Sequence, residues 1–581
     1  MIAASSATAE MPAVPGECKD APGAGRGIAP ATQGLIALLM YLAAWLAAKA
    51  SPLLIHPGWA QLSQGGMDPN FYVWSLRWWP YAIAHGLNPL HSSLVRVPAG
   101  ADLAWITTIP PLALLAAPVT VLVGPVVSFN LLVVASLPVS AWAAFILCRR
   151  ITCRFWPALA GGAVYGFSTY ETSHVASGQL NLAFAPLLPL IAYLVLAWWE
   201  GKLGGRAFTA LLGLAMAAQF YLFIETFAGL TVVLAVALAA GYALAGRRRR
   251  PVVARLIGLT GLAYLLALVL AAPYLRAALE HVPPGFVRDP SGQGLDLVSL
   301  VSFQQGGALG LKSLALAGGW HPPLPKGGYI GVPLLAIAAF LALFTWSRRL
   351  TRFLTIMFAF VVVAALGPAV KMYGRTLFEL PWHSLWYLPI VRSSFPTRLM
   401  IFGSLALAVI TASFLVAPPK KLPWLYPLQW LLAITGIFIV AASAATLQLS
   451  RGPGVPAFIT TGEYRHYIAP GATIVVVSHT GNAGLLWQAE TNFYPRLAGG
   501  FLNEVVTRRT ALPHPVANLV IGKLTKQDIL RFRSFVRAAR VAAILVGIHT
   551  LRKWQTVLAK LGFRRRVFGR VILYRPPGGW S

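Results

Sequence analysis

A few carboxylates in a mostly apolar chain are the first candidates for chemistry. Asp68 precedes Pro69, and an aromatic-rich amphipathic stretch follows directly. A carboxylate in such a place can act as a general base that takes a proton from an attacking hydroxyl group. Pro at a first helical turn equally fits Asp68 as a plain N-cap. The pattern leaves both interpretations open and predicts an interfacial helix that begins just after Asp68.

A second polar group gathers near the end of a predicted span. Glu171, His174 and Gln179 lie close together in the sequence, and Asn181 opens the next apolar run. Ionisable residues next to membrane spans are often functional. We interpret His174 as a catalytic candidate that positions the molecule carrying the attacking hydroxyl group (the acceptor), assists a base or binds a metal. Glu171, Gln179 and Asn181 are candidate substrate contacts, and the alternative for His174 is a loop histidine that faces water.

Glu225 is the second candidate for a catalytic carboxylate. It lies between two apolar runs with no basic neighbour in the sequence, where a carboxylate is costly unless it is paired or solvated. Arg392 and Arg398 flank a proline at the start of another run, and guanidinium groups suit phosphate binding. We predict that both arginines contact phosphate, with snorkelling to the membrane surface as the alternative.

The sequence leaves the metal question open. Asp68 with Glu225, Glu171 or His174 would suit Mg²⁺ or Mn²⁺, because these ions prefer oxygen ligands. No spacing in the sequence decides whether a metal binds. No glycine-rich phosphate loop precedes a helix, so nucleotide-driven pumping has no support.

The composition indicates a membrane protein. Of 581 residues, 57% are hydrophobic and 11% are charged, against about 25% charged residues in soluble domains. Apolar runs of about 20 residues recur, and each can cross a bilayer. We predict about eleven spans, near 33–54, 126–147, 157–173, 181–199, 207–224, 226–245, 254–275, 328–346, 353–370, 398–416 and 424–448.

Loop charge orients these spans. With the N-terminus in the cytoplasm, the basic clusters such as Arg247–Arg250 fall on the cytoplasmic side, as the positive-inside rule requires. The proline-broken stretch 107–124 would invert this pattern if it spanned, so we place it along the outer face. The net charge of +31 therefore indicates membrane lipids as partners and not nucleic acid. We predict a multi-pass protein of the inner (plasma) membrane.

Three regions follow from this pattern. Residues 1–32 form a disordered cytoplasmic tail, and 33–449 form a transmembrane module whose first outer loop covers 55–125. Residues 450–581 form a small extracytoplasmic domain. Short strand-like runs at 473–478, 541–547 and 571–574 alternate there with helical patterns at 526–539 and 550–561. That alternation predicts an α/β domain.

Several motifs resemble the GT-C glycosyltransferases, and within them a YfhO-like bacterial branch. The motifs are Asp68-Pro69, Trp74, Trp78-Trp79-Pro80, His85-Gly86-Leu87-Asn88-Pro89, Pro98-Ala99-Gly100, Tyr165-Gly166-Phe167-Ser168, His174 with Gly178-Gln179-Leu180-Asn181, and Arg392-Ser393-Ser394-Phe395-Pro396-Thr397-Arg398. The resemblance implies a mostly α, polytopic bundle. It implies an inverting enzyme that transfers a sugar from a polyprenyl-phosphate donor to a glycan, lipid or protein acceptor. Asp68 would be its base, and Trp78 a substrate contact.

Two other functions remain open from the sequence. A lipid-linked glycan transporter or flippase would have polar residues at mid-membrane depth in matching halves of the chain, and no internal repeat is evident. A non-catalytic envelope assembly protein would tolerate substitution of all the outer carboxylates.

Overall fold

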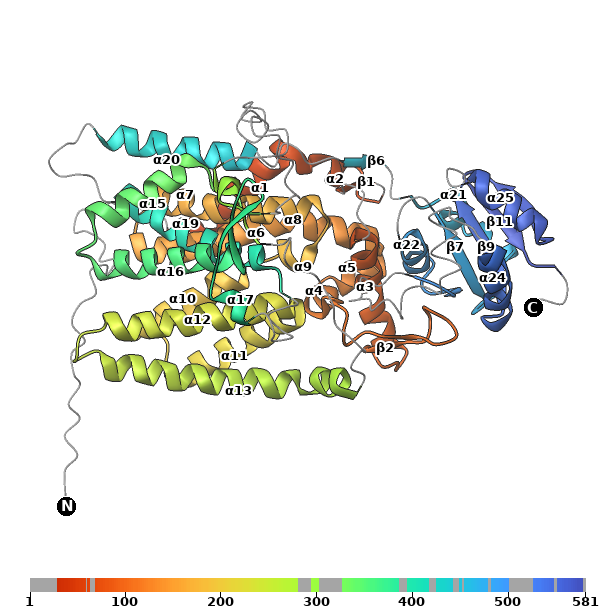
Figure 1. Ribbon diagram of the computed structural model, residues 1–581, viewed down its shortest axis with the longest axis horizontal. Helices are drawn as coiled ribbons and strands as arrows, with labels where there is room; N and C mark the ends of the chain where they lie inside the picture. The colour runs from red at the N-terminus through yellow and green to blue at the C-terminus, as the bar shows by residue number, and fades with distance from the viewer. Residues whose placement is uncertain are drawn as a thin grey trace, which may run out of the picture.

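The computed structural model describes residues 29–58, 60–62, 68–280, 294–301, 327–385, 394–416, 425–442, 449–451, 454–478, 482–500, 526–547 and 551–577. Structural statements below concern these residues. Helices dominate, and they form an elongated bundle with a separate α/β unit at one end (Figure 1).

Six helical segments of the described chain are long and apolar enough to cross a membrane. They are Pro30–Ile55 (α1, η1 and α2), Pro125–Thr152 (α6), Leu180–Trp199 (α9 and α10), Ile224–Leu244 (α12), Arg250–Glu280 (α13) and Pro396–Val416 (η3 and α19). The remaining predicted spans contain α7 (Phe155–Gly166), α11 (Gly205–Leu222), α15 (Val332–Phe344), α16 (Arg349–Ala365) and α20 (Leu425–Ala442). The chain is a multi-pass membrane protein, and the number of eleven spans stays a prediction.

The helices at the periphery of the bundle expose large apolar side chains, unlike the surface helices of a soluble protein. On α13, Leu265 and Val269 are more than half exposed, and the same helix buries the small residues Ala263 and Ala267 against its neighbours. Large side chains that point outward along a long helix need lipid around them, because water would make their exposure unfavourable.

Two predicted segments differ from simple spans. The stretch 157–173 ends as a helix at Gly166, and a separate helix, α8 (Thr169–Ala176), begins after Ser168, whose side chain accepts the backbone N–H of Glu171. The stretch 107–124 forms α4 (Pro110–Leu115) and α5 (Ala117–Leu122), each six residues long. Six residues rise about 9 Å, far short of a bilayer core.

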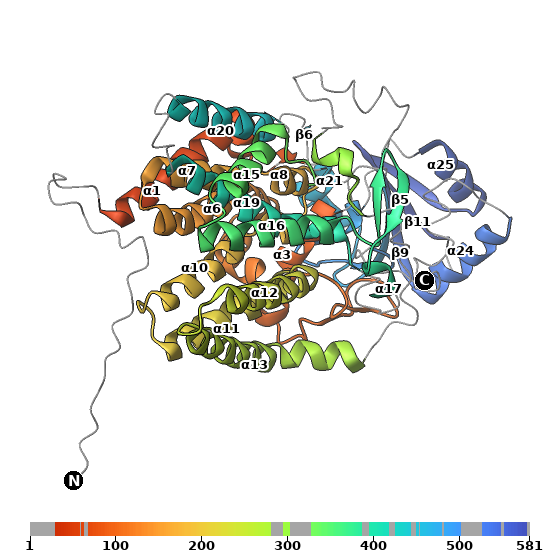
Figure 2. The ribbon, with the colours of Figure 1, turned by 60° about the vertical axis from the view of Figure 1, so that its left-hand side comes forward.

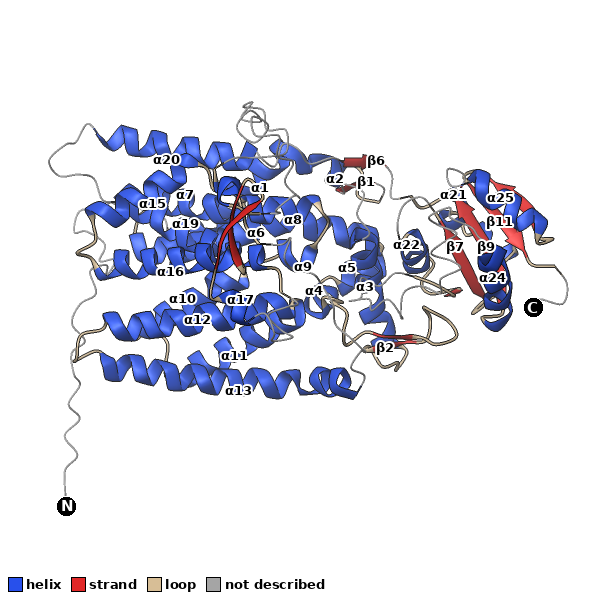
Figure 3. Cartoon of the chain, viewed as in Figure 1, coloured by secondary structure: helices blue, strands red, loops and turns tan. Residues whose placement is uncertain are grey.

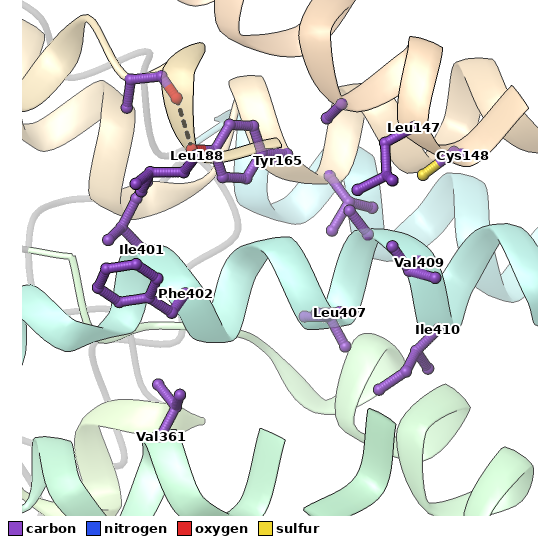
Figure 4. Close-up of a cluster of buried hydrophobic side chains, with 14 of the residues drawn as sticks. Leu147, Cys148, Tyr165, Leu188, Val361, Ile401, Phe402, Leu407, Val409 and Ile410 are labelled. Carbon is purple, nitrogen blue, oxygen red and sulfur yellow. Dashed lines mark hydrogen bonds between the residues drawn. The ribbon is translucent and has the colours of Figure 1, made fainter. Parts of the chain in front are cut away.

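The centre of the bundle is the contact of α6, α7 and α19. A Cβ atom at Gly161 of α7 would lie 2.8 Å from both the Ala408 carbonyl oxygen and the Cys148 sulfur, so only glycine permits this approach. Tyr165 fills the space beside α10, and its hydroxyl donates to the Ala185 carbonyl oxygen at 2.8 Å (Figure 4). Close packing fixes the helices that carry the polar residues described below.

Helix α3 (Asp68–Ala84) lies across the end of the bundle, between it and the α/β unit (Figure 1). The sequence predicts this helix, and the structure confirms it. Its apolar residues are buried almost all round, which a helix lying on a membrane surface alone would not achieve. Protein therefore covers α3 on both sides.

The α/β unit has a five-stranded mixed sheet in the order β10-β11-β9-β7-β8 (Figure 3). Its strands are β7 (Thr473–Val477), β8 (Arg496–Leu497), β9 (Val541–Gly547), β10 (Arg564–Phe568) and β11 (Val571–Arg575). Strand β7 pairs in parallel with β8 and β9, whereas β11 pairs antiparallel with β9 and β10. The helices around it include α21 (Ala457–Thr460), α22 (Ala483–Glu490), α24 (Lys526–Ala538) and α25 (Leu551–Lys560).

Short strands complete the fold. Strand β1 (Ala60–Leu62) pairs with β6 (Leu449–Arg451), β2 (His91–Ser92) with β3 (Ala101–Asp102), and β4 (Ala369–Met372) with β5 (Arg375–Glu379). The turn between β4 and β5 is held by buried Asp296, whose carboxylate accepts the backbone N–H of Tyr373 and Gly374 at 3.3 and 2.8 Å. We interpret Asp296 as structural.

The sheet and α3 are joined by a buried amide. Gln488 of α22 accepts the indole N–H of Trp74 at 2.9 Å and donates to the carbonyl oxygens of Leu94 and Pro495 at 2.8 and 3.0 Å. The backbone of Leu94 also accepts the N–H of Leu497, at 2.8 Å. The loop after α3 therefore extends the sheet edge, and Gln488 satisfies three polar groups that burial would otherwise leave costly.

We predict that Gln488→Leu loosens the docking of the sheet on α3. The leucine has a similar volume but cannot bond to Trp74, Leu94 or Pro495, so the free energy of unfolding of this region falls by roughly 1–3 kcal/mol. Thermal unfolding and limited proteolysis of protein in nanodiscs would measure the change. Gln555→Ala, on the half-exposed side of α25, is the control, and equal effects of both variants would contradict the prediction.

Candidate active site

Asp68 lies in the first helical turn of α3, and the loop that follows α8 packs against this end of the helix. Gly178 in that loop has a φ of +65°, and a Cβ atom there would collide with the ring of Pro69. Glycine is therefore required twice, by its backbone conformation and by the close approach. This contact brings the turn after α8 against the start of α3 and sets the next residue, Gln179, beside Asp68.

A chain of hydrogen bonds joins Asp68, Gln179 and His174. The amide nitrogen Nε2 of Gln179 donates to Asp68 Oδ2 at 2.7 Å, and Gln179 Oε1 lies 2.7 Å from His174 Nδ1. An ionised carboxylate only accepts, so Gln179 must present its NH₂ group to Asp68 and its oxygen to His174. His174 then carries its proton on Nδ1, as this arrangement assigns it.

His174 is enclosed by protein. It is 3% exposed, and its ring meets that of Tyr170 edge-on with centroids 4.5 Å apart. The alternative of a loop histidine that faces water is therefore wrong. His174 reaches Asp68 through Gln179, which makes it a positioning residue in this geometry and not a base next to the reacting atoms.

Asn181 and Tyr72 form a second tie between the same segments. The Tyr72 hydroxyl donates to Asn181 Oδ1 at 2.6 Å, and both side chains are buried. Burial raises the pKa of Tyr72 well above its usual value; the nearby Asp68 charge raises it further, and Arg398 lowers it. Tyr72 thus stays a neutral donor to Asn181 Oδ1, and the substrate contact predicted for Asn181 stays a prediction.

The electrostatic influence of Arg398 on Tyr72 places this arginine in the same region. Its guanidinium pairs with the carboxylate of Glu225 and lies over the ring of Phe395, 4.1 Å from the centroid. The backbone N–H of Phe395 donates to the other Glu225 oxygen at 2.5 Å. Arg392 lies outside the described residues, so its predicted role is not tested.

The ion pair changes the interpretation of Glu225. Each of its two oxygens has a donor, one from Arg398 and one from the Phe395 backbone, so the basic neighbour missing in the sequence comes from 173 residues away. A carboxylate held in this way anchors Arg398 and is poorly placed to accept a substrate proton. The structure favours a positioning role for Glu225 over the predicted catalytic one.

Glu171 and Trp78 lie in packed protein. Glu171 is fully buried in α8. Trp78 is 1% exposed, stacks on Trp74 with centroids 5.4 Å apart, and donates its indole N–H to the Pro89 carbonyl oxygen at 2.9 Å. In this structure Trp78 supports the docking of α3, and neither residue offers a surface to a substrate.

Sequence reasoning missed Tyr72. Tyr72 lies four residues after Asp68 on one helix, so both side chains share a face; that spacing was the available signal. Gly178 belongs to one of the motifs that carry the resemblance, but its close contact with Pro69 could not be predicted from the sequence. Among the described residues no three His, Cys, Asp or Glu side chains come together as a metal site, so the candidates Mg²⁺ and Mn²⁺ gain no ligand set from them.

No protein-family model matches the sequence, and no curated protein matches it. Solved structures do. The chain is similar to the arabinofuranosyltransferase AftD from Mycobacteria (12% identity, 96% of this chain and 40% of that chain, TM-score 0.58). It is also similar to the oligosaccharyltransferase AglB from Archaeoglobus fulgidus, solved with an inhibitory peptide and a dolichol-phosphate (12% identity, 94% of this chain and 74% of that chain, TM-score 0.52).

A third similar structure is ArnT from Cupriavidus metallidurans, bound to undecaprenyl phosphate (12% identity, 95% of this chain and 99% of that chain, TM-score 0.50). The chain spans 40% of the length of AftD and nearly all of ArnT. At these identities the likeness concerns the fold. The predicted YfhO-like branch stays a prediction, and the chain has the fold of the GT-C glycosyltransferases.

Proposed function

We propose that this protein is an inverting membrane glycosyltransferase that uses a polyprenyl-phosphate-linked sugar. The observation that carries the proposal is the hydrogen bond from Gln179 to Asp68, which orients a carboxylate at one end of a GT-C-like bundle. The structural neighbours AglB and ArnT are solved with polyprenyl phosphates, which supports a donor of that chemical class. The acceptor is a glycan, lipid or protein.

Asp68 is the general base in the proposed reaction. The acceptor hydroxyl attacks the anomeric carbon, its proton passes to the Asp68 carboxylate, and the bond from the anomeric carbon to the phosphate oxygen breaks. The electron pair leaves with the polyprenyl phosphate. A single displacement of this kind inverts the anomeric configuration. The amide of Gln179 holds Asp68 in one orientation, and His174 holds that amide.

Arg398 is the proposed contact for the phosphate group. A guanidinium can bond a phosphate through two nitrogens and offset the charge that builds up as the bond breaks. Glu225 fixes the arginine from one side, and Phe395 and Phe223 lie against it with ring centroids 4.1 and 5.1 Å away. We assign Arg392 the same role by its place in the sequence.

The reaction takes place on the outer face of the membrane in this proposal. The α12–α13 connection, with its arginines, lies at the end of the bundle opposite the sheet (Figure 1). Basic loops favour the cytoplasm, which supports an outside location for the opposite end, with Asp68 and the α/β unit. Membrane lipids surround the bundle, and the donor lipid reaches the site from the outer leaflet.

We predict that Asp68→Asn lowers the rate of sugar transfer by about 10²–10⁴-fold, the usual contribution of a general base. Binding of polyprenyl phosphate should persist, since the substitution keeps the size of the side chain. Release of polyprenyl phosphate from candidate donors by protein in nanodiscs would measure it. Glu280→Gln, an exposed carboxylate paired with Arg276, is the control. Full activity of the folded Asp68→Asn protein would refute the mechanism, and lipid binding with no release for any donor would favour a flippase.

The hydrogen-bond chain predicts strong coupling between Gln179 and His174. Gln179→Leu should lower kcat by roughly 10-fold with little change in KM, because the base loses its orientation. His174→Ala should add little on top, since it acts through the same amide. A double-mutant cycle on kcat tests this. Additive effects of the two substitutions would show that His174 acts separately.

The ion pair predicts that Arg398 and Glu225 act on the donor. Arg398→Lys should raise KM for the donor several-fold and also lower kcat, because lysine keeps the charge but loses the planar fork that would hold the phosphate as the bond breaks. Glu225→Gln should shift KM in the same direction. Steady-state kinetics at varied donor concentration would measure both. A Glu225→Gln protein that loses kcat as Asp68→Asn does, with unchanged KM, would instead restore the catalytic interpretation of Glu225.

A further inference from the structure

The two faces of the C-terminal sheet have different surroundings. Side chains alternate along its strands, so that Ile474, Leu545 and Leu573 belong to the core shared with α22 and α3. Their neighbours Ile544 and Ile572 pack instead under α24 and α25. These two helices therefore cover the face that points away from the bundle, as Figures 1 and 2 show from two directions.

The outward surface of α24 is basic. Phe532 and Val536 face the sheet, whereas Arg531, Arg533 and Arg537 of the helix are exposed. Arg540, in the turn just after the helix, is exposed as well. Arg533 and Arg537 are four residues apart and so share one side of the helix, and Arg540 follows at its C-terminal end. Like charges four residues apart on a helix repel each other, so a helix that keeps both arginines presents a concentrated positive charge.

The basic character extends beyond this helix. Residues 526–577 contain 13 Lys and Arg and one acidic residue, Asp528. On β10, the outermost strand, Arg565 pairs in register with Tyr574, whose side chain belongs to the core under α24 and α25. Exposed Arg565 therefore lies on the same side of the sheet. We call Arg533, Arg537, Arg540 and Arg565 the distal basic surface.

We propose that the distal basic surface binds an anionic polysaccharide, a chain whose sugars carry carboxylate or phosphate groups. Guanidinium groups bond both anions well. The surface points along the bundle axis away from the membrane-spanning helices (Figure 1), so the sheet itself separates it from the headgroups of the membrane that the bundle crosses. The choice of a glycan over nucleic acid rests on the proposed function, which places this domain outside the cell.

An extended polymer suits this surface better than a small anion does. The arginines belong to a helix, to the turn after it and to a separate edge strand, and a chain with repeated charges can contact several such elements together. Binding of this kind would hold the enzyme on an anionic acceptor polymer or keep that polymer close to the site. It would weaken with salt, because exposed charges are screened.

The test is a binding measurement with the full chain in zwitterionic nanodiscs. Polygalacturonate is the anionic probe and dextran the neutral one. R533Q/R537Q/R540Q should weaken polygalacturonate binding on the order of 10- to 100-fold, as the loss of three basic residues facing an anionic surface would. R247Q/R248Q/R249Q removes the same charge from the opposite end of the bundle and should leave binding unchanged. Dextran should not bind.

Equal loss in both triple variants, binding that ignores salt, or equal binding of dextran would overturn the proposal. Preferential binding of phosphatidylglycerol vesicles or of duplex DNA would overturn it as well, in favour of a lipid or a nucleic acid. Release of polyprenyl phosphate, followed in parallel with a neutral acceptor, separates the two proposals. If release depends on Asp68 but polygalacturonate does not bind, only the proposed binding surface is refuted. If polygalacturonate binding depends on the arginines but no donor releases polyprenyl phosphate, the proposed enzyme activity is refuted and the binding surface is retained.

Discussion

The amide of Gln179 is the interaction on which the proposed active site depends. It joins α3 to the turn after α8 across 111 residues of sequence and gives the Asp68 carboxylate a defined orientation. That contact requires Gly178, because any larger residue would push the turn away from Pro69. An amide suits this position because it is a donor on one side and an acceptor on the other. A carboxylate or an ammonium group could serve only one neighbour.

Helix α3 transmits the constraint to the rest of the protein. On one side Asp68 and Tyr72 meet the α8–α9 segment through Gln179 and Asn181, and on the other Trp74 meets Gln488 of α22. The α/β unit therefore contributes to the geometry of Asp68 through the contact of Gln488 with Trp74. Its opposite face carries the distal basic surface, so a single small sheet links the helix that carries Asp68 to the proposed polymer-binding surface.

The ion pair of Glu225 and Arg398 is a separate constraint, which positions an arginine and not the Asp68 carboxylate. Charges at the end of an apolar bundle are costly unless they are paired and hydrogen-bonded. Glu225 is satisfied by Arg398 and by the Phe395 backbone, and the aromatic rings of Phe223 and Phe395 cover the guanidinium. Such an arrangement keeps an arginine in place inside a partly apolar region, where a phosphate could meet it with little reorganisation.

The sequence by itself determined the membrane character, the helix that begins at Asp68, and the strands and helices near 473–478, 541–547, 571–574, 526–539 and 550–561. These features follow from hydropathy and local periodicity, which neighbouring residues encode. It also pointed to Asp68, His174, Gln179 and Asn181, because polar residues are rare enough in such a chain to stand out. Only the tertiary structure decided how they combine. Contacts between distant segments produce the pairing of Glu225 with Arg398, the burial of Trp78 and Glu171, and the hydrogen bond of Tyr72 to Asn181. A local sequence pattern does not predict which distant segments will meet.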